Sequence, residues 1–211
     1  MHEESDNVWA ILGLGNPGNK YSNTRHNVGF WSADALREEL FRASVFLTKF
    51  NCEYFKFSLP SKQVLIVIKP LGYMNLSGET AYPLLNFFKV PPRQTIVIHD
   101  DVDLETGAVK AKLGGSNAGH HGLDSLETQL GTKEFYRVRI GISRAVEGQR
   151  DVSSWVLSAP KGQEAECLRQ TAQDGAKFAL EIINSGLKKA TQKFSRGLLL
   201  SDIKVLVERS P

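Results

Sequence analysis

Short apolar runs alternate along this chain with segments whose apolar residues recur at helical spacing. Runs rich in β-branched and aromatic residues predict strands, because such side chains pack well on a pleated surface. Apolar residues three and four positions apart predict helices, since they fall on one helical face. The expected strands are residues 8–12, 51–59, 63–69, 95–98, 107–113 and 135–142. The expected helices are residues 29–43, 76–90, 119–130 (beginning as a loop), 163–184 and 187–196. Strands interleaved with helices predict a mixed α/β sheet that is covered on both faces.

Three of these segments carry further information. The run over residues 63–69 is apolar on both faces, which predicts a central strand. Pro83 lies inside the stretch 76–90, so that helix is either kinked or starts later than the pattern suggests. In the strand over 135–142, Arg137 and Arg139 are two positions apart and therefore lie on one face.

Length and composition indicate one folded domain. The chain has 211 residues, of which 23% are charged, as in ordinary globular proteins. Its longest aliphatic run is Val64–Ile68, against about 20 residues needed to span a bilayer, so no membrane partner is expected. The acidic start is unlike a signal peptide. Cys52 and Cys167 are too few for a disulfide framework, so we expect a cytoplasmic protein.

The net charge of +3 is unevenly distributed. Residues 1–149 are neutral, and the whole excess of Lys and Arg lies in residues 150–211. A polyanionic partner is therefore expected to contact that end of the chain. A balance of this size is weak evidence for nucleic acid by itself, because many solvated surfaces have it.

Two glycine-rich segments resemble nucleotide-binding motifs but lack parts that those motifs need. Gly13–Gly18 satisfies G-x-G-x-x-G, yet its Asn-Pro-Gly predicts a turn where a dinucleotide fold begins the helix that meets the pyrophosphate. The second segment, Gly114–His120 (the glycine loop), approaches a P-loop, but His120 and His121 stand where Lys and Ser or Thr are required. We therefore expect no cofactor.

Polar residues stand at the ends of several apolar elements, where they could meet in one cleft. A neutral histidine beside a carboxylate can take a proton from water, and asparagine amides can donate to a carbonyl oxygen that gains charge. Such a set suits water-mediated acyl hydrolysis, although each member could instead be a turn or capping residue. Its members are Asn16, Tyr21, His26, Met74, Asn75, Asp100, His120 and His121.

Metal and nucleophilic-serine chemistry find less support. Adjacent His120 and His121 cannot readily face one ion, and no cysteine or second histidine pair has ligand spacing. Ser116 is followed by Asn-Ala-Gly, which does not match a nucleophile elbow. We expect no metal site.

Five ordered motifs, spread from about residue 8 to residue 197, resemble those of the bacterial-type peptidyl-tRNA hydrolase family. They are Gly13–Gly18 with Tyr21 and Thr24–Gly29; Lys69-Pro70 with Tyr73–Gly78; His99–Leu104; Lys112–Gly115 with Gly119-His120; and Arg137–Ile142. Such an ordered set is far more specific than a single glycine-rich loop. The resemblance implies a single-domain, three-layer α/β/α fold with a central mixed twisted sheet over residues 1–197.

The resemblance also implies an activity and a partner. It implies a monomeric, cofactor-free enzyme that hydrolyses the ester between a peptide and the 3′-terminal adenosine at the acceptor end of tRNA, and so recycles tRNA. In this match His26 takes the place of the catalytic histidine and Asp100 that of its supporting carboxylate. The matches that orient the substrate or wall the cleft are Asn16, Tyr21, Met74, Asn75, His120 and His121.

The resemblance places tRNA phosphates against cations from two parts of the chain. Lys110, Lys112 and Arg139 match basic positions on strands. On the last expected helix, Lys189 and Lys193 share one face with Arg196, which agrees with the charge excess near that end. A solvated helix face is the alternative interpretation of this stripe.

Position 121 departs from the family pattern. The family usually has His-Asn-Gly in the glycine loop, whereas this chain has His120-His121-Gly122. An imidazole could replace one hydrogen bond of the amide but not all of them. We therefore expect His121 to face the cleft within reach of His26 and Asp100.

Two questions follow from the departures. The replaced asparagine leaves a non-hydrolytic relative that binds tRNA or other RNA as the alternative function, although the retained His26, Asp100, Asn16 and Asn75 favour an enzyme. The tail over residues 198–211 is longer and more apolar than the family pattern, and we assign it no role.

Overall fold

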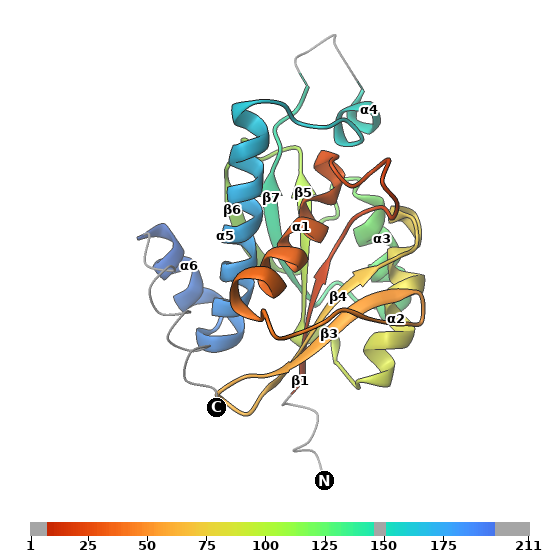
Figure 1. Ribbon diagram of the computed structural model, residues 1–211, viewed down its shortest axis with the longest axis vertical. Helices are drawn as coiled ribbons and strands as arrows, with labels where there is room; N and C mark the ends of the chain where they lie inside the picture. Colours follow the sequence, from red (N-terminus) through yellow and green to blue (C-terminus); the bar gives the residue numbers. More distant parts are fainter. Residues whose placement is uncertain (1–7, 146–150, 197–211) are drawn as a thin grey trace.

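The computed structural model describes residues 8–145 and 151–196, and the tail over 198–211 lies outside them. The described chain forms one seven-stranded sheet between two layers of helices (Figure 1). The expected three-layer α/β/α architecture is therefore confirmed. None of the helices in the described residues is long and apolar enough to cross a membrane.

The sheet is mixed, as expected, with a parallel centre and antiparallel edges. Its spatial order is β2-β3-β4-β1-β5-β7-β6. The four consecutive strands β4, β1, β5 and β7 run parallel, whereas β2, β3 and β6 form antiparallel pairs. The strand expected to be central, β4, is an inner strand beside the middle strand β1. The bounds are β1 Val8–Gly13, β2 Leu47–Lys49, β3 Cys52–Ser58, β4 Val64–Pro70, β5 Thr95–Asp101, β6 Val109–Leu113 and β7 Tyr136–Gly141.

The helices correct the sequence pattern in three places. The stretch 29–43 is a shorter helix, α1, continued by one π-helical turn, η3. The helix expected over 76–90 begins at Ser77 and contains the exposed Pro83, so of the two alternatives the later start is excluded. The short helix α4 was not predicted. The helices are α1 Val28–Ala35, α2 Ser77–Phe87, α3 His121–Leu130, α4 Val152–Val156, α5 Gln163–Ser185 and α6 Leu187–Ser195, with short turns η2 Arg25–Asn27, η3 Leu36–Leu40, η4 Met74–Leu76 and η5 Pro92–Gln94.

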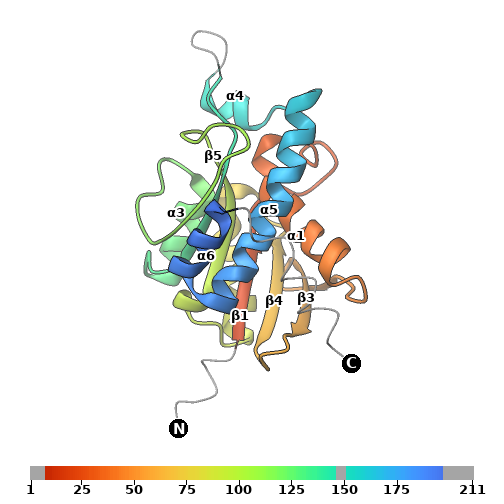
Figure 2. The same cartoon turned by 90° about the vertical axis from the view of Figure 1, so that its left-hand side faces the viewer.

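Two apolar clusters hold the layers together, one on each face of the sheet. Successive side chains of a strand point to opposite faces, so Ile11 packs among residues of α1, α5 and α6, while Leu12 packs among residues of α2 and α3. Figure 2 views the first of these layers, with α5 and α6 in front of the sheet. Each fully buried aliphatic side chain contributes about 1.5–3 kcal/mol relative to an exposed one.

The order of the strands reverses at β1, and we call this position in the sheet the reversal point. Such a reversal favours a ligand-binding site. The chain passes from β1 to β4 on one side and then to β5 on the other. Open α/β sheets bind ligands at such a point, outside the carboxyl ends of the strands. Gly29 brings the start of α1 close to this edge, because a Cβ there would overlap backbone atoms of Leu14 and Ile98.

Candidate active site

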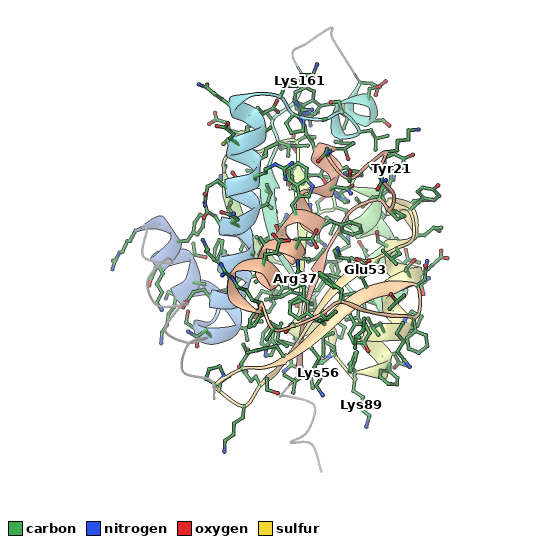
Figure 3. The ribbon with its side chains drawn as sticks, in the orientation of Figure 1. Tyr21, Arg37, Glu53, Lys56, Lys89 and Lys161 are labelled. Atoms are coloured by element: carbon green, nitrogen blue, oxygen red, sulfur yellow. The ribbon has the colours of Figure 1, made fainter. Side chains whose placement is uncertain are left out.

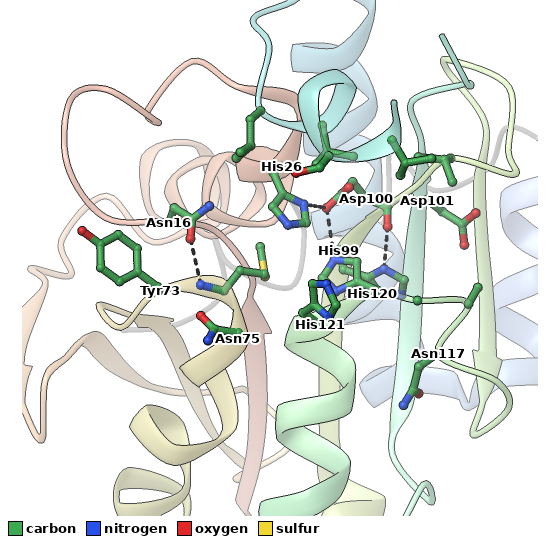
Figure 4. A pocket seen from close by; sticks show the side chains of 18 of the residues that line it. Asn16, His26, Tyr73, Asn75, His99, Asp100, Asp101, Asn117, His120 and His121 are labelled. Atoms are coloured by element: carbon green, nitrogen blue, oxygen red, sulfur yellow. Dashed lines mark hydrogen bonds and ion pairs between the residues drawn. The ribbon is translucent and has the colours of Figure 1, made fainter. Parts of the chain in front are cut away.

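A pocket of about 940 Å³ lies at the carboxyl ends of β1, β4 and β5 (Figure 4). Of the predicted site residues, Asn16, His26, Met74, Asn75, Asp100, His120 and His121 line it. Tyr21 does not line it; this side chain lies on the loop after β1 (Figure 3), with its ring edge-on to Tyr73 at a centroid distance of 6.4 Å. Tyr73 does line the pocket. The fold therefore brings side chains from distant segments together.

His26 and Asp100 form a hydrogen-bonded pair across the reversal point. His26 lies in turn η2, and its Nδ1 is 2.8 Å from Oδ1 of Asp100. The carboxylate can only accept, so the neutral ring carries its proton on Nδ1 and keeps a lone pair on Nε2. Burial lowers the pKa of His26, but the charge and hydrogen bond of Asp100 outweigh it, so the pKa is raised above the ordinary 6.5.

Asp100 stays ionised although it is buried at the end of β5. Burial by itself raises the pKa of a carboxyl group. The charges of His26 and His120, together with the hydrogen bonds from both rings, lower the pKa of Asp100 well below its usual range. The pocket therefore holds a permanent negative charge that can stabilise an imidazolium.

The first turn of α3 determines the tautomer of His120. His120 is the N-cap of this helix, and its Nδ1 accepts the backbone N–H of Gly122 over 3.2 Å. The neutral ring must therefore carry its proton on Nε2, which lies 3.2 Å from Oδ1 of Asp100. His120 thus donates a second hydrogen bond to the oxygen that His26 already contacts.

His121 lies in the same pocket but makes a different contact. Its side chain is 76% exposed, and its Nδ1 is 3.7 Å from Oδ2 of Asp124, one turn further along α3. We had expected His121 to be within reach of His26 and Asp100, but the contact with Asp100 comes from His120. The reason is the start of α3, which turns residue 120 inward as a cap and leaves residue 121 at the exposed edge of the pocket.

His99 belongs to the site and was missed as a site residue in the sequence. Its Nδ1 donates to the backbone carbonyl of Asp100 over 2.7 Å, and its ring lies 4.9 Å from that of His120. Burial, and then the charge of His120, hold the pKa of His99 well below its ordinary value, so this ring is neutral. Its place directly before Asp100, at the end of an apolar strand, was the available signal.

The side-chain amide of Asn16 has a defined orientation. Its Oδ1 accepts the backbone N–H of Met74 over 2.8 Å, so its Nδ2 is free to donate into the pocket on the side of His26 (Figure 4). Asn27 holds the Asn16 backbone through two hydrogen bonds of 2.9 Å. Asn75 is exposed at the pocket edge. Both amides are suitably located to bind a substrate carbonyl.

A wall of the pocket that the sequence did not indicate comes from α4 and the residue after it. Val152, Val156 and Leu157 line this side, opposite the polar groups on the ends of the strands. The helix is only five residues long, too short for its apolar spacing to be recognised. Asn117 of the glycine loop and Val102 also line the pocket.

The predicted basic strand residues form a ladder on one face of β6 and β7. Lys110 lies opposite Arg139 and Lys112 opposite Arg137. Arg137 is fully buried and donates to the glycine loop, while Nε of Arg139 is 2.7 Å from Oδ2 of Asp101. Burial, then the charges of Arg139 and Arg137, lower the pKa of Lys112. Of these four cations, Lys110 is exposed and Lys112 is half-buried.

The predicted stripe on α6 is divided between two environments. Nζ of Lys193 forms a 2.8 Å ion pair with Oε1 of Glu181, whose side chain is 1% exposed. A buried carboxylate is costly without a positive partner, so Lys193 has a structural task and is less suited to bind tRNA than the pattern predicts. Lys189 and Arg196 are exposed.

Within the described residues, one group of three side chains offers metal ligands: His26, Asp100 and His120, with ligand atoms within 4.8 Å of one another. Hydrogen bonds account for this closeness. A metal on Nε2 of His120 would shift the ring proton to Nδ1, which would then face the N–H of Gly122. Two opposed donors are unfavourable, so the geometry favours the hydrogen-bonded arrangement.

The fold and the site together define an α/β enzyme whose histidine–carboxylate pair can activate water. The family model for peptidyl-tRNA hydrolase matches residues 10–201, and the chain belongs to that family. It is 46% identical over 168 residues to the peptidyl-tRNA hydrolase of Bacillus licheniformis. This aligned region covers 80% of this chain and 88% of that protein. The chain is 42% identical over 185 residues to that of Campylobacter curvus, covering 88% and 95%. The crystal structure of peptidyl-tRNA hydrolase from Acinetobacter baumannii superposes with a TM-score of 0.81 at 26% identity, over 91% of this chain and 96% of that one.

Proposed function

We propose that this enzyme hydrolyses the ester bond between peptide and tRNA in peptidyl-tRNA, with His26 as the general base. The observation that carries the proposal is the 2.8 Å contact between Nδ1 of His26 and Oδ1 of Asp100. It leaves the lone pair of Nε2 to take a proton from water. Membership of the peptidyl-tRNA hydrolase family supports the substrate.

The reaction proceeds in two proton transfers. Nε2 of His26 takes a proton while the water oxygen attacks the ester carbonyl carbon, and Asp100 stabilises the imidazolium that forms. The amide of Asn16 donates to the carbonyl oxygen as charge develops there. The ester C–O bond then breaks, and the imidazolium returns the proton to the departing ribose oxygen. The products are tRNA and a free peptide whose new carboxylic acid loses its proton to solvent.

Electrostatic contacts outside the pocket hold the tRNA in this proposal. Phosphates near the acceptor end meet Lys110 and Lys112 on β6, with Arg139 beside them, so that the 3′-terminal adenosine enters the pocket. Lys189 contributes from α6. The enzyme acts without cofactor and as a monomer, and light scattering on the purified protein tests its oligomeric state.

The deciding experiment compares two substrates. An N-acylated aminoacyl-tRNA should be cleaved, whereas aminoacyl-tRNA with a free ammonium group should be largely spared, because a cation is costly to desolvate in this pocket. Equal turnover of both substrates would contradict the proposal. The alternative, a non-hydrolytic tRNA-binding protein, predicts a shifted tRNA band on a gel with the ester intact.

A further inference from the structure

The arginine that precedes His26 has a buried and almost fully used guanidinium group. The side chain of Arg25 is 4% exposed. Its Nε and Nη2 donate to the two carboxylate oxygens of Glu164 over 2.8 and 2.6 Å, and its Nη1 donates to Oγ and the carbonyl of Ser158 over 2.7 and 3.0 Å. The ring of Trp155 lies 3.7 Å from the guanidinium carbon.

The backbone of Arg25 is held by the same segment. Its N–H donates to the carbonyl of Ser158 over 3.1 Å. These partners come from α4, the residues after it and the first turn of α5. On the other flank of turn η2, Asn27 exchanges two hydrogen bonds of 2.9 Å with Asn16. His26 is thus the middle residue of a turn that is anchored on both sides.

We propose that Arg25 is a positioning residue for His26, acting through its clamp to Glu164, Ser158 and Trp155. The inference rests on the proposed role of His26 as the base. Arg25 is not available to tRNA, because its side chain is 4% exposed and its donors are directed to these partners. A planar fork that binds a carboxylate at two points restricts orientation as well as distance, which a lysine ammonium does not do.

The clamp also joins the base to the apolar wall of the pocket. Trp155 stacks on Arg25 and donates from Nε1 to the carbonyl of Ser143 over 2.8 Å, while its neighbour Val156 lines the pocket. A shift of α4 would therefore reach His26 through Arg25. A misplacement of about 1 Å costs on the order of 100-fold in rate for an oriented catalytic group.

The test compares Arg25→Lys and Glu164→Gln with a matched control, Arg169→Gln. Arg169 of α5 also contacts the region around His26, through Asn23 in the preceding loop at 3.4 Å and the ring of Trp31 in α1 at 5.2 Å. However, Arg169 is exposed, and both of these contacts lie outside η2. For each variant we would measure kcat and KM on peptidyl-tRNA, the pH profile of kcat/KM, and the melting temperature.

Arg25→Lys should lower kcat by about 10- to 100-fold and change KM by less than about threefold. The acidic limb of its pH profile of kcat/KM should move to lower pH. In this variant His26 is held less firmly beside Asp100, so the charge of Asp100 raises the pKa of His26 by less. Glu164→Gln should change the same quantities in the same direction by less, and Arg169→Gln should leave them unchanged.

A purely structural role gives a different pattern. If Arg25→Lys lowers the melting temperature but leaves kcat and the pH profile unchanged, the proposal is wrong. If Arg25→Lys does not fold, Glu164→Gln decides by the same two readouts. Failure of the proposed function would show separately, as an unmodified enzyme that does not cleave peptidyl-tRNA.

Discussion

Nε2 of His120 lies 3.2 Å from Oδ1 of Asp100, the oxygen that also accepts the Nδ1–H of His26. One carboxylate oxygen therefore receives two ring protons. Because the N–H of Gly122 determines which nitrogen of His120 is protonated, the backbone of α3 influences the orientation of Asp100 and, through it, that of His26. Residue 120, rather than the unusual residue 121, is the one joined to the reacting pair.

This relationship predicts different effects at two adjacent histidines. His120→Ala should lower kcat by about 10- to 100-fold, as expected for the loss of one hydrogen bond to a charged group in the site. His121→Ala should lower it by less than about threefold, and His121→Asn should retain activity, since this side chain is largely exposed and pairs with Asp124. Steady-state kinetics of the three variants test whether kcat falls most in His120→Ala. A greater loss at position 121 would contradict it.

Removing either member of the reacting pair should separate catalysis from binding. His26→Ala should abolish turnover, and Asp100→Asn should reduce kcat by about 10²- to 10⁴-fold, because the ring loses the partner that sets its tautomer and stabilises its charge. Binding of tRNA, measured by gel shift, should stay nearly unchanged in both. Normal kcat in His26→Ala would remove His26 from the reaction.

The pH dependence follows from the sign of the His26 shift. A general base works only when neutral, and Asp100 raises the pKa of His26 above 6.5. Activity should therefore decline with falling pH, with an acidic midpoint above that value. In Asp100→Asn the charge is gone while the burial that lowers the pKa remains, so the midpoint of the residual activity should move to lower pH. If the midpoint is the same in Asp100→Asn as in the unmodified enzyme, the decline in activity at low pH reports the titration of another group.

Phosphate binding by the strand ladder predicts a salt-dependent KM. Lys112→Gln should raise KM and reduce its dependence on ionic strength with little change in kcat, because the contact is equal in ground and transition states. Lys56→Gln removes the same charge from the exposed part of β3, toward the other end of the sheet from Tyr21 (Figure 3), and is the matched control. A fall in kcat alone would place Lys112 in the chemistry.

The two lysines of α6 should differ in their effect on stability. Lys193→Gln leaves the buried carboxylate of Glu181 without its ion pair and should cost about 1–3 kcal/mol in the free energy of unfolding. Lys189→Gln should cost less than about 0.5 kcal/mol, since this side chain is exposed. Urea denaturation measures both. Equal stability of the two variants would show that the pair with Glu181 contributes little.

Local patterns predicted most of the fold. The strands β1, β4 and β5 appear as apolar runs because both of their faces are buried, and α5 appears through its helical spacing. The three-residue β2, the five-residue α4 and the π turn after α1 were not foreseen. Elements of this length contain too few residues to show a helical or strand periodicity of apolar positions. Contacts with other segments of the chain, and not local preference, determine them.

Local patterns in the sequence showed which chemical groups are present and which expected element each follows. Asn16 and His26 follow the first strand, Asn75 follows the strand over 63–69, and Asp100 follows the strand over 95–98. The folded chain was needed to show that His120, and not His121, turns toward Asp100, and that Lys193 forms an ion pair with Glu181. The physical reason is that these assignments depend on contacts between distant segments. Arg25 and its partner Glu164 are 139 residues apart, and no local pattern relates two positions at that separation.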